Sequence, residues 1–118
     1  MNQRAVRGAI TVEKNTPKSI KNATKKLLGE IISKNEIRVD DICFILFSTT
    51  QDLDAVFPAK AARDMGLNTV PLLDVSQMQV VESLQRCIRI LLVFNTNKSL
   101  ADINHVYLEK ARELRPDF

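Results

Sequence analysis

The spacing of apolar residues predicts three strands in the body of the chain. Residues 4–12 alternate, which is typical of a strand with one face in a core. One face carries Gly8 and three aliphatic residues, and the other carries Arg7: Val6, Gly8, Ile10 and Val12 against Ala5, Arg7, Ala9 and Thr11. Residues 42–47 form an uninterrupted apolar run, as expected for a central strand covered on both faces. Residues 87–94 predict a further strand.

Two helices are predicted between these strands. Thr16 and Pro17 are typical of a helix start, with Thr as the N-cap and Pro at the first helical position. Apolar residues then recur at helical spacing, with lysines between them: Ile20, Ala23, Leu27, Leu28, Ile31 and Ile32. This helix should end near Asn35, and a short second helix should begin at Pro58 and end at Gly66.

The remaining segments are shorter. Residues 69–73 predict a short strand, residues 76–85 a loop or a poor helix, and residues 109–114 a final helical turn. The order strand, helix, strand, helix, strand, strand predicts an α/β layer with one sheet and helices on one face. Because no repeat, linker or low-complexity segment is present, we expect a single domain over residues 1–118.

Composition narrows the functional classes. The chain is mildly basic, with a net charge of +3 and a pI near 9.0, but it contains no basic run of five or more residues. Dispersed charge, one Tyr and no Trp disfavour nucleic-acid binding, although a basic RNA-binding α/β domain remains an alternative. A small anionic substrate fits the charge equally well.

Several kinds of site and location are disfavoured. Cys43 and Cys87 lie inside apolar runs, as expected for buried thiols in a reducing compartment. His105 is the single histidine, so neither a histidine-built metal site nor a nucleophile–histidine pair is expected. The N-terminus has no apolar signal region and no run approaches the length of a membrane span, so we expect a cytoplasmic protein without a membrane segment.

Two arginines inside apolar strands are the main candidates for function. Arg7 and Arg89 each carry a permanent charge, and burying an unpaired guanidinium costs several kcal/mol. Each therefore requires an anionic partner, either an internal carboxylate or a ligand. Arg89 could form a structural salt bridge with Asp74 or Asp52, and Arg7 could keep its head in water at a sheet edge.

Five other polar groups accompany them. Lys60 and Arg63 lie three residues apart on one face of the second predicted helix, where they could equally form a solvated surface. Tyr107 is the only tyrosine, and could be a core residue with a satisfied hydroxyl. Asp74 and Gln77 precede the strand of Arg89 and could be ordinary turn residues. With no general base or nucleophile in view, an enzyme built from these groups would act by positioning and electrostatics.

The chain resembles the monofunctional, trimeric α/β-type chorismate mutases. Co-linear motifs that cover essentially the whole chain carry this resemblance: Arg7-Gly8-Ala9-Ile10-Thr11-Val12-Glu13, residues 47–53 and 55–63, Val70-Pro71-Leu72, Cys87-Ile88-Arg89, His105-Val106-Tyr107-Leu108-Glu109, and Leu114-Arg115-Pro116-Asp117. It implies an α/β (α+β, ferredoxin-like) subunit with a mixed sheet, helices on one face, and three subunits in a pseudo α/β-barrel trimer.

The resemblance also implies an activity, the Claisen rearrangement of chorismate to prephenate in aromatic amino acid biosynthesis, without a cofactor or metal. Chorismate carries two carboxylates, which would explain the excess of cationic groups. By this resemblance Arg89 contacts the breaking ether oxygen, and Arg7 and Tyr107 hold the side-chain carboxylate. The wall from the neighbouring subunit would contain Phe57, Lys60, Arg63 and Leu73, and Leu114 and Arg115 would belong to a tail that closes over the site.

Two positions depart from the family pattern. The family usually has a glutamate where this chain has Gln77, and often a cysteine where it has Asp74. Because both positions contact the substrate hydroxyl in the family, we expect Asp74 to take over part of the role of Gln77, near Arg89.

Three other functions stay open at this stage. A non-catalytic relative that binds a chorismate-like dicarboxylate is suggested by Gln77. A trimeric imine deaminase of similar shape would also use an arginine for a substrate carboxylate, and the third is the RNA-binding domain named above.

Overall fold

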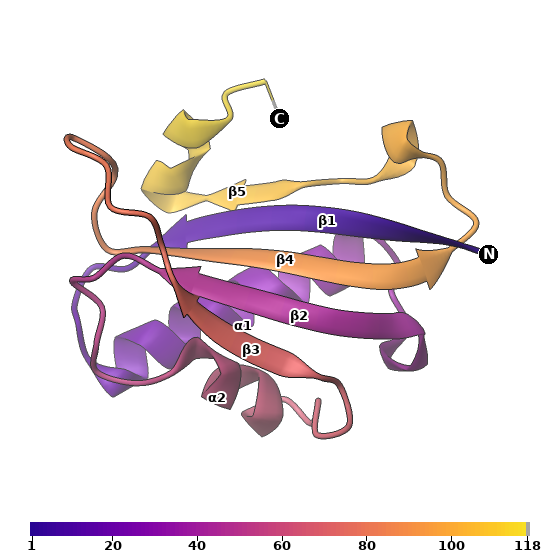
Figure 1. The fold of residues 1–118 in the computed structure, drawn as a ribbon, viewed down its shortest axis with the longest axis horizontal. Coiled ribbons are helices and arrows are strands. Elements are labelled where there is room, and N and C mark those ends of the chain that lie inside the picture. Colours follow the sequence, from indigo (N-terminus) through magenta and orange to yellow (C-terminus); the bar gives the residue numbers. More distant parts are fainter. Residues whose placement is uncertain (118) are drawn as a thin grey trace.

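A five-stranded mixed sheet forms the centre of the molecule (Figure 1). The computed structural model describes residues 1–117, and Phe118, the last residue of the expected domain, lies outside the described residues. The sheet order is β3-β2-β4-β1-β5. Its strands are β1 (Asn2–Thr11), β2 (Ile42–Thr49), β3 (Leu72–Ser76), β4 (Cys87–Thr96) and β5 (Val106–Leu108). β4 pairs antiparallel with β1 and β2, whereas β1·β5 and β2·β3 are parallel, so β4 runs opposite to the other four.

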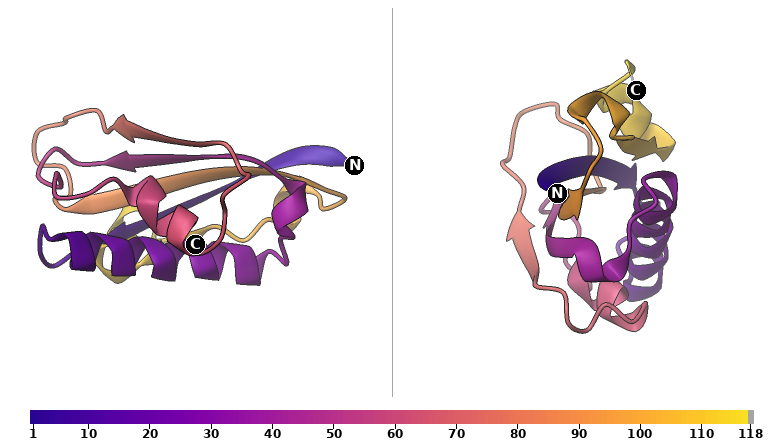
Figure 2. Two further views of the ribbon diagram at one scale, coloured as in Figure 1. Left: turned by 90° about the horizontal axis from the view of Figure 1, so that it is seen from below. Right: turned by 90° about the vertical axis from the view of Figure 1, so that its right-hand side faces the viewer.

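The helices cover one face of this sheet (Figure 2). α1 (Pro17–Lys34) begins where the sequence predicts, because the Thr16 side chain accepts a hydrogen bond from the backbone N–H of Ser19 at 3.1 Å. It ends at Asn35, also as predicted. α2 (Pro58–Asp64) is followed by Gly66, whose positive φ of 95° favours glycine. Short 3₁₀ helices also occur within residues 1–117: η1 (Val39–Asp41), η2 (Leu100–Asp102) and η3 (Glu109–Leu114).

The main core lies between the sheet and these helices. Apolar residues of alternate strand positions pack against the inner face of α1, with these members at its centre: Val6, Ile10, Ile20, Leu27, Leu28, Ile31, Ile45, Phe47, Ile88, Ile90, Leu92 and Phe94. Gly8 allows close packing here, because a Cβ on it would lie 2.8 Å from Ile31 Cδ1 and 2.9 Å from the backbone oxygen of Val106. The predicted division of β1 into a core face and an Arg7 face is confirmed: Val6 and Gly8 are buried and Arg7 is exposed.

The predicted mixed sheet with helices on one face is confirmed, with three corrections in detail. β3 spans Leu72–Ser76 rather than 69–73, because it pairs with β2 from Ile45 onward. β5, where sequence analysis predicted no strand, is a strand parallel to β1. The element order β-α-β-α-β-β-β differs from the ferredoxin-like order β-α-β-β-α-β, because α2 precedes β3. Among residues 1–117, none of the helices has the length and apolar character needed to cross a membrane.

Candidate functional site

One row of paired residues crosses the sheet on the face that carries no helix. Ala9 of β1 pairs with Arg89 on one side and with Tyr107 on the other, and Arg89 pairs with Ser48 of β2, which pairs with Val75 of β3. Cross-strand partners point to the same face of a sheet. Ser48 lines the open space beside Arg89, whereas Ala9 is buried and packs with Cys87 and Ala111 of η3.

Arg7, Arg89 and Tyr107 meet in a hollow beside this row. The hollow has a volume of about 250 Å³ and is named here the Arg89 hollow: it is lined by Arg7, Gly8, Leu46, Ser48, Val75, Arg89, Ile90, Leu91 and Tyr107. Arg7 precedes Ala9 by two residues and so lies on the same face. The structure thus brings together the two arginines and the tyrosine that sequence analysis selected.

The Arg89 side chain has no carboxylate partner in the described part of the chain. Its Nε atom is buried and has no hydrogen-bond partner in the described part of the chain. No carboxylate among residues 1–117 forms a salt bridge with Arg89, so neither Asp74 nor Asp52 is its structural partner. The guanidinium contacts the buried thiol of Cys87, where burial raises the thiol pKa and Arg89 acts in the opposite direction. An unpaired buried N–H costs about 1–3 kcal/mol, and an anionic ligand would remove that cost.

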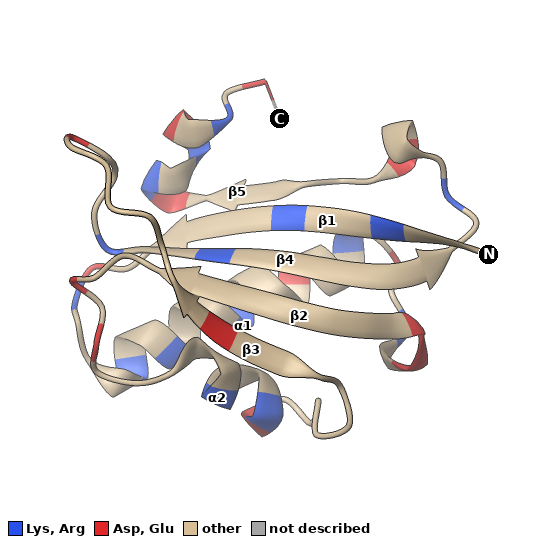
Figure 3. Cartoon of the chain, in the orientation of Figure 1, with Lys and Arg blue, Asp and Glu red and all other residues tan. Residues whose placement is uncertain are grey.

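Cationic and acidic groups occupy different strands of the sheet. Figure 3 shows Lys and Arg positions on β1 and β4 and an Asp or Glu position on β3. The acidic residue of β3 is Asp74, and Arg7 and Arg89 are the basic residues that line the Arg89 hollow. The described residues contain no group of three or more His, Cys, Asp or Glu side chains that could hold a metal ion.

A second hollow lies at the β3 edge of the sheet, beside α2. It has a volume of about 540 Å³ and is named the Phe57 hollow: it is lined by Thr49, Leu53, Asp54, Ala55, Val56, Phe57, Pro58, Lys60, Asp74, Val75 and Ser76. Phe57 is 68% exposed, which is high for a large aromatic side chain. Sequence analysis assigned Phe57 and Lys60 to one wall, and the structure brings these two residues together with Asp74.

Asp74 faces α2 within this hollow. Its Oδ1 accepts a hydrogen bond from the backbone N–H of Ala59 at 3.0 Å. Burial raises the pKa of the carboxyl group above its ordinary value, while the Ala59 N–H and the charge of Arg63 act in the opposite direction. Arg63 itself is exposed on α2.

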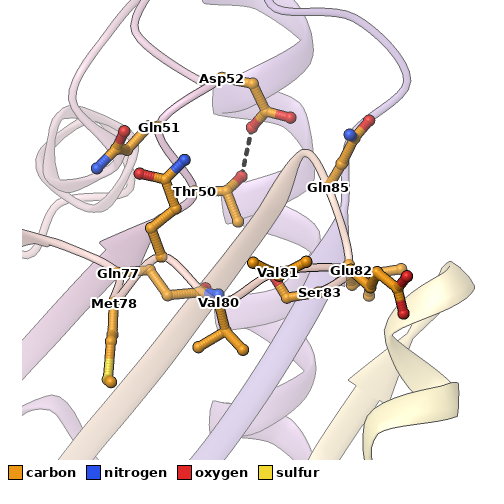
Figure 4. Close-up of a pocket in the computed structure, with 12 residues that line it drawn as sticks. Thr50, Gln51, Asp52, Gln77, Met78, Val80, Val81, Glu82, Ser83 and Gln85 are labelled. Atoms are coloured by element: carbon orange, nitrogen blue, oxygen red, sulfur yellow. Dashed lines mark hydrogen bonds between the residues drawn. The ribbon is translucent and has the colours of Figure 1, made fainter.

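Gln77 lines a third hollow, formed with the loop that follows β3 (Figure 4). Its lining residues are Thr50, Gln51, Asp52 and the segment 77–85, and its volume is about 500 Å³. The Gln77 Oε1 atom is buried and has no hydrogen-bond partner among residues 1–117. Within one chain Gln77 and Asp74 line different hollows, and neither of them lines the Arg89 hollow. That both contact the same substrate hydroxyl, with Asp74 near Arg89, stays a prediction.

Leu73 and Arg115 complete the set of predicted site residues. Leu73 is 57% exposed and belongs to the face of β3 opposite to Asp74. Arg115 follows η3 and pairs with Asp117, at 3.1 Å from Nε and 2.8 Å from Nη2. Its charge also acts on Tyr107 and His105, so this end of the chain lies beside the Arg89 hollow.

Sequence reasoning missed one residue of this region. His105 was considered only for a metal site or a nucleophile–histidine pair, yet its Nδ1 accepts a hydrogen bond from the backbone N–H of Arg7 at 3.0 Å. The signal was available, because His105 lies two residues before Tyr107 and a strand places such residues on the same face.

Comparison with known proteins points to one family. The family model described as chorismate mutase type I matches residues 3–118. The chorismate mutase AroH of Thermus thermophilus is 44% identical over 115 residues, which covers 97% of this chain and 94% of that protein. The chorismate mutase AroH of Bacillus subtilis (strain 168) is also 44% identical over 115 residues, with 97% and 91% covered. A solved chorismate mutase from Clostridium thermocellum superposes with a TM-score of 0.92 at 46% identity, covering 93% of this chain and 98% of the other.

Proposed function

This chain belongs to the chorismate mutase type I family, and we propose that it is an isomerase that converts chorismate to prephenate. The observation that carries the proposal is the buried Nε of Arg89, which has no hydrogen-bond partner within residues 1–117 and lies beside a hollow that also holds Arg7 and Tyr107. A Claisen rearrangement requires no proton transfer or covalent intermediate. A site with preplaced cationic donors and without a general base suits such a reaction.

Arg89 stabilises the transition state in this proposal. As the ether bond of chorismate breaks, negative charge develops on its oxygen, and the Arg89 guanidinium donates hydrogen bonds to that atom. Donors already directed at developing charge typically contribute about 3–4 kcal/mol. Because Arg89 is held in a central strand between β1 and β2, little reorganisation is needed during the reaction.

Arg7, Tyr107 and Arg115 select the reactive conformer. Arg7 and Tyr107 hold the side-chain carboxylate from one side of Arg89, and Arg115 adds positive charge at the same edge. Holding both ends of the substrate lowers the entropic cost of bringing the reacting carbons together. The Gln77 Oε1 atom accepts the hydrogen bond of the substrate hydroxyl, which satisfies a buried acceptor that has no partner within the described chain.

A second copy of the chain supplies the other wall, in a homotrimer with sites between subunits. The Phe57 hollow, with Phe57, Lys60 and Asp74, would meet the Arg89 hollow of the neighbouring chain, with Arg63 and Leu73 at its margin. Apolar exposure on the open face of the sheet supports this arrangement, because Phe44, Leu73 and Val75 are 37%, 57% and 43% exposed.

The reaction needs no cofactor in this proposal, and its place is the cytoplasm. Cys43 and Cys87 are both free thiols, as is usual in a reducing compartment. Chorismate is the only partner besides further copies of the chain, and neither nucleic acid nor a membrane takes part.

The test is direct incubation with chorismate while prephenate formation is followed. Wild-type protein should convert chorismate, and Arg89→Ala should lower kcat by about 100- to 1,000-fold. Arg4→Ala is the matched control, because Arg4 lies on the same sheet but its Nε donates to the backbone oxygen of Lys98 at 3.1 Å, away from the hollow. A folded protein that binds chorismate without forming prephenate would instead be a non-catalytic dicarboxylate-binding relative. Near-normal turnover by Arg89→Ala would overturn the role given to that residue.

A further inference from the structure

The side chain of His105 extends the hydrogen bonding between β5 and β1 by one position. Parallel pairing of β1 with β5 begins at Gly8 and Val106. One residue earlier, the backbone N–H of Arg7 donates to Nδ1 of His105 at 3.0 Å. The imidazole nitrogen therefore occupies the position at which a longer β5 would present an acceptor, and it sets the backbone of the residue that carries the Arg7 guanidinium.

The segment before His105 is anchored to α1. The fully buried side chain of Asn35 accepts a hydrogen bond from the Asn104 N–H at 2.8 Å and donates to the Asn104 oxygen at 2.8 Å. The same amide also donates to the Ile31 oxygen of α1 at 2.9 Å. Because Asn104 is held on both its polar backbone atoms, the ring of His105 starts from a fixed position.

The contact requires one protonation state of the ring. Nδ1 can accept a hydrogen bond only in the neutral tautomer that carries its proton on Nε2. The charged and titratable groups around the ring are Arg7 of β1, Tyr107 of β5, and Arg115 with its partner Asp117. Burial, Arg7 and Arg115, in that order, lower the pKa of His105 from its ordinary value of 6.5, so the ring is neutral at pH 7.

We propose that His105 is a positioning residue whose neutral ring holds the backbone of Arg7 in place for the substrate carboxylate, and whose protonation releases it. Once protonated, Nδ1 becomes a donor facing the Arg7 N–H, and a third positive charge joins Arg7 and Arg115. The role of the carboxylate rests on the proposed chorismate mutase function, whereas the link between His105 and Arg7 does not.

The expected kinetic signature is a rise in KM that is larger than any fall in kcat. Arg7 holds a carboxylate that is present in both substrate and transition state, so loosening it weakens both to a similar extent. Arg89 belongs to β4, which pairs with β1 along the edge opposite to β5 and His105. Arg89 should therefore keep its action on the breaking bond. In wild-type protein KM for chorismate should rise as the pH falls through the pKa of His105, while kcat changes little.

Two variants separate a lost acceptor from a lost structural residue. Asparagine places its Oδ1 close to the position of Nδ1 and does not titrate, so His105→Asn should give a KM that stays flat with pH. Leucine fills the space without an acceptor, so the KM of His105→Leu should be about two- to tenfold above that of His105→Asn at every pH. A KM of His105→Asn that rises in acid as in the wild type would overturn the proposal.

A measurement without substrate tests the link itself. His105 is the only histidine of the chain, so its ring Cε1–H signal in an NMR titration is unambiguous. The amide ¹⁵N shift of Arg7 should change with the same midpoint, below 6.5, and this change should disappear in His105→Asn. If the ¹⁵N shift of the Arg7 amide does not change while His105 titrates, the proposal is overturned, even if the protein converts chorismate. If chorismate is not converted but the two signals move together, the positioning link stands and the proposed function fails.

Discussion

The Asp74 carboxylate accepts a hydrogen bond from the backbone N–H of Ala59 at 3.0 Å, which ties β3 to the first turn of α2. The residue at the start of this helix, Phe57, has no side chain that could accept such a bond. A carboxylate from a strand fifteen residues later therefore satisfies a backbone donor that a local Ser, Thr, Asp or Asn usually satisfies.

Two substitutions of Asp74 should separate the effect of its hydrogen-bond acceptor on stability from the effect of its negative charge. Asp74→Ala removes the acceptor and should lower the free energy of unfolding by about 0.5–2 kcal/mol. Asp74→Asn keeps an oxygen for the Ala59 N–H. Because the folded pKa of Asp74 is raised, the stabilisation that its neutral form brings is present below the unfolded pKa and is lost as the pH rises through the folded pKa. At pH 7 Asp74→Asn should thus be at least as stable as the wild type in urea unfolding. Equal losses in both variants would contradict this account.

Gln77 should act through its acceptor oxygen. Gln77→Leu removes the buried Oε1 and should lower kcat/KM by about tenfold, the effect of one hydrogen bond. Gln77→Glu retains an acceptor and should keep most of the activity. Gln79→Leu is the matched control, because Gln79 lines the same hollow but is exposed. The measurement is steady-state kinetics with chorismate. If kcat/KM of Gln77→Leu equals that of the wild type, Gln77 does not belong to the site.

A side chain at position 8 should destabilise the fold, whereas one at position 29 should be tolerated. In Gly8→Ala the new Cβ would lie 2.9 Å from the backbone oxygen of Val106 and 2.8 Å from Ile31 Cδ1, so β5 or α1 must shift. We expect a loss of about 1–3 kcal/mol in the free energy of unfolding and faster amide exchange in β5. Gly29 lies inside α1, and a Cβ added there would meet nothing within 4 Å, so Gly29→Ala should stabilise by about 0.5–1 kcal/mol. Thermal unfolding of the two variants should therefore shift in opposite directions.

Local signals predicted the parts of the fold that local interactions determine. Thr16 and Pro17 begin α1 because the cap and the fixed φ of proline act within one turn. The alternation along β1 correctly placed Arg7 on the face opposite to Gly8, because side chains of a strand alternate whatever it pairs with. β5 was missed because it has only three residues, and its pairing with β1 joins segments that lie far apart in the chain.

The candidate site could be predicted as a list of residues but not as a geometry. Asp74 and Gln77 were treated as neighbours because three residues separate them in an assumed loop. Asp74 in fact lies inside β3, where it pairs with Phe47, whereas Gln77 follows the end of that strand, and the two side chains line different hollows. Polar Asp74 and Ser76 concealed that strand, since its stability comes from parallel pairing with β2 rather than from an apolar pattern. The sequence indicated that His105 shares a face with Tyr107, but not that its ring contacts Arg7, because that contact joins residues 98 positions apart.

Subunit mixing should show whether two chains build each site. The Arg89 hollow and the Phe57 hollow belong to one chain but are lined by different residues, and only Val75 is common to both. Arg89→Ala and Lys60→Ala should each be inactive or nearly so as pure proteins, which is established first. After the two are unfolded and refolded together in equal amounts, an interface between an intact Arg89 and an intact Lys60 should arise at about one quarter of the sites of random trimers.

Activity should then return to a corresponding fraction of the wild-type value. A shared site needs only an intact Arg89 from one chain and an intact Lys60 from its neighbour. Native mass spectrometry verifies that hybrid trimers are present, and co-refolding each variant with itself is the control for recovery caused by refolding alone. If every site were built within a single chain, each chain would carry one lesion and no mixture could be active. Hybrid trimers without any recovered turnover would therefore refute the shared site, even if the wild-type protein converts chorismate and forms a trimer.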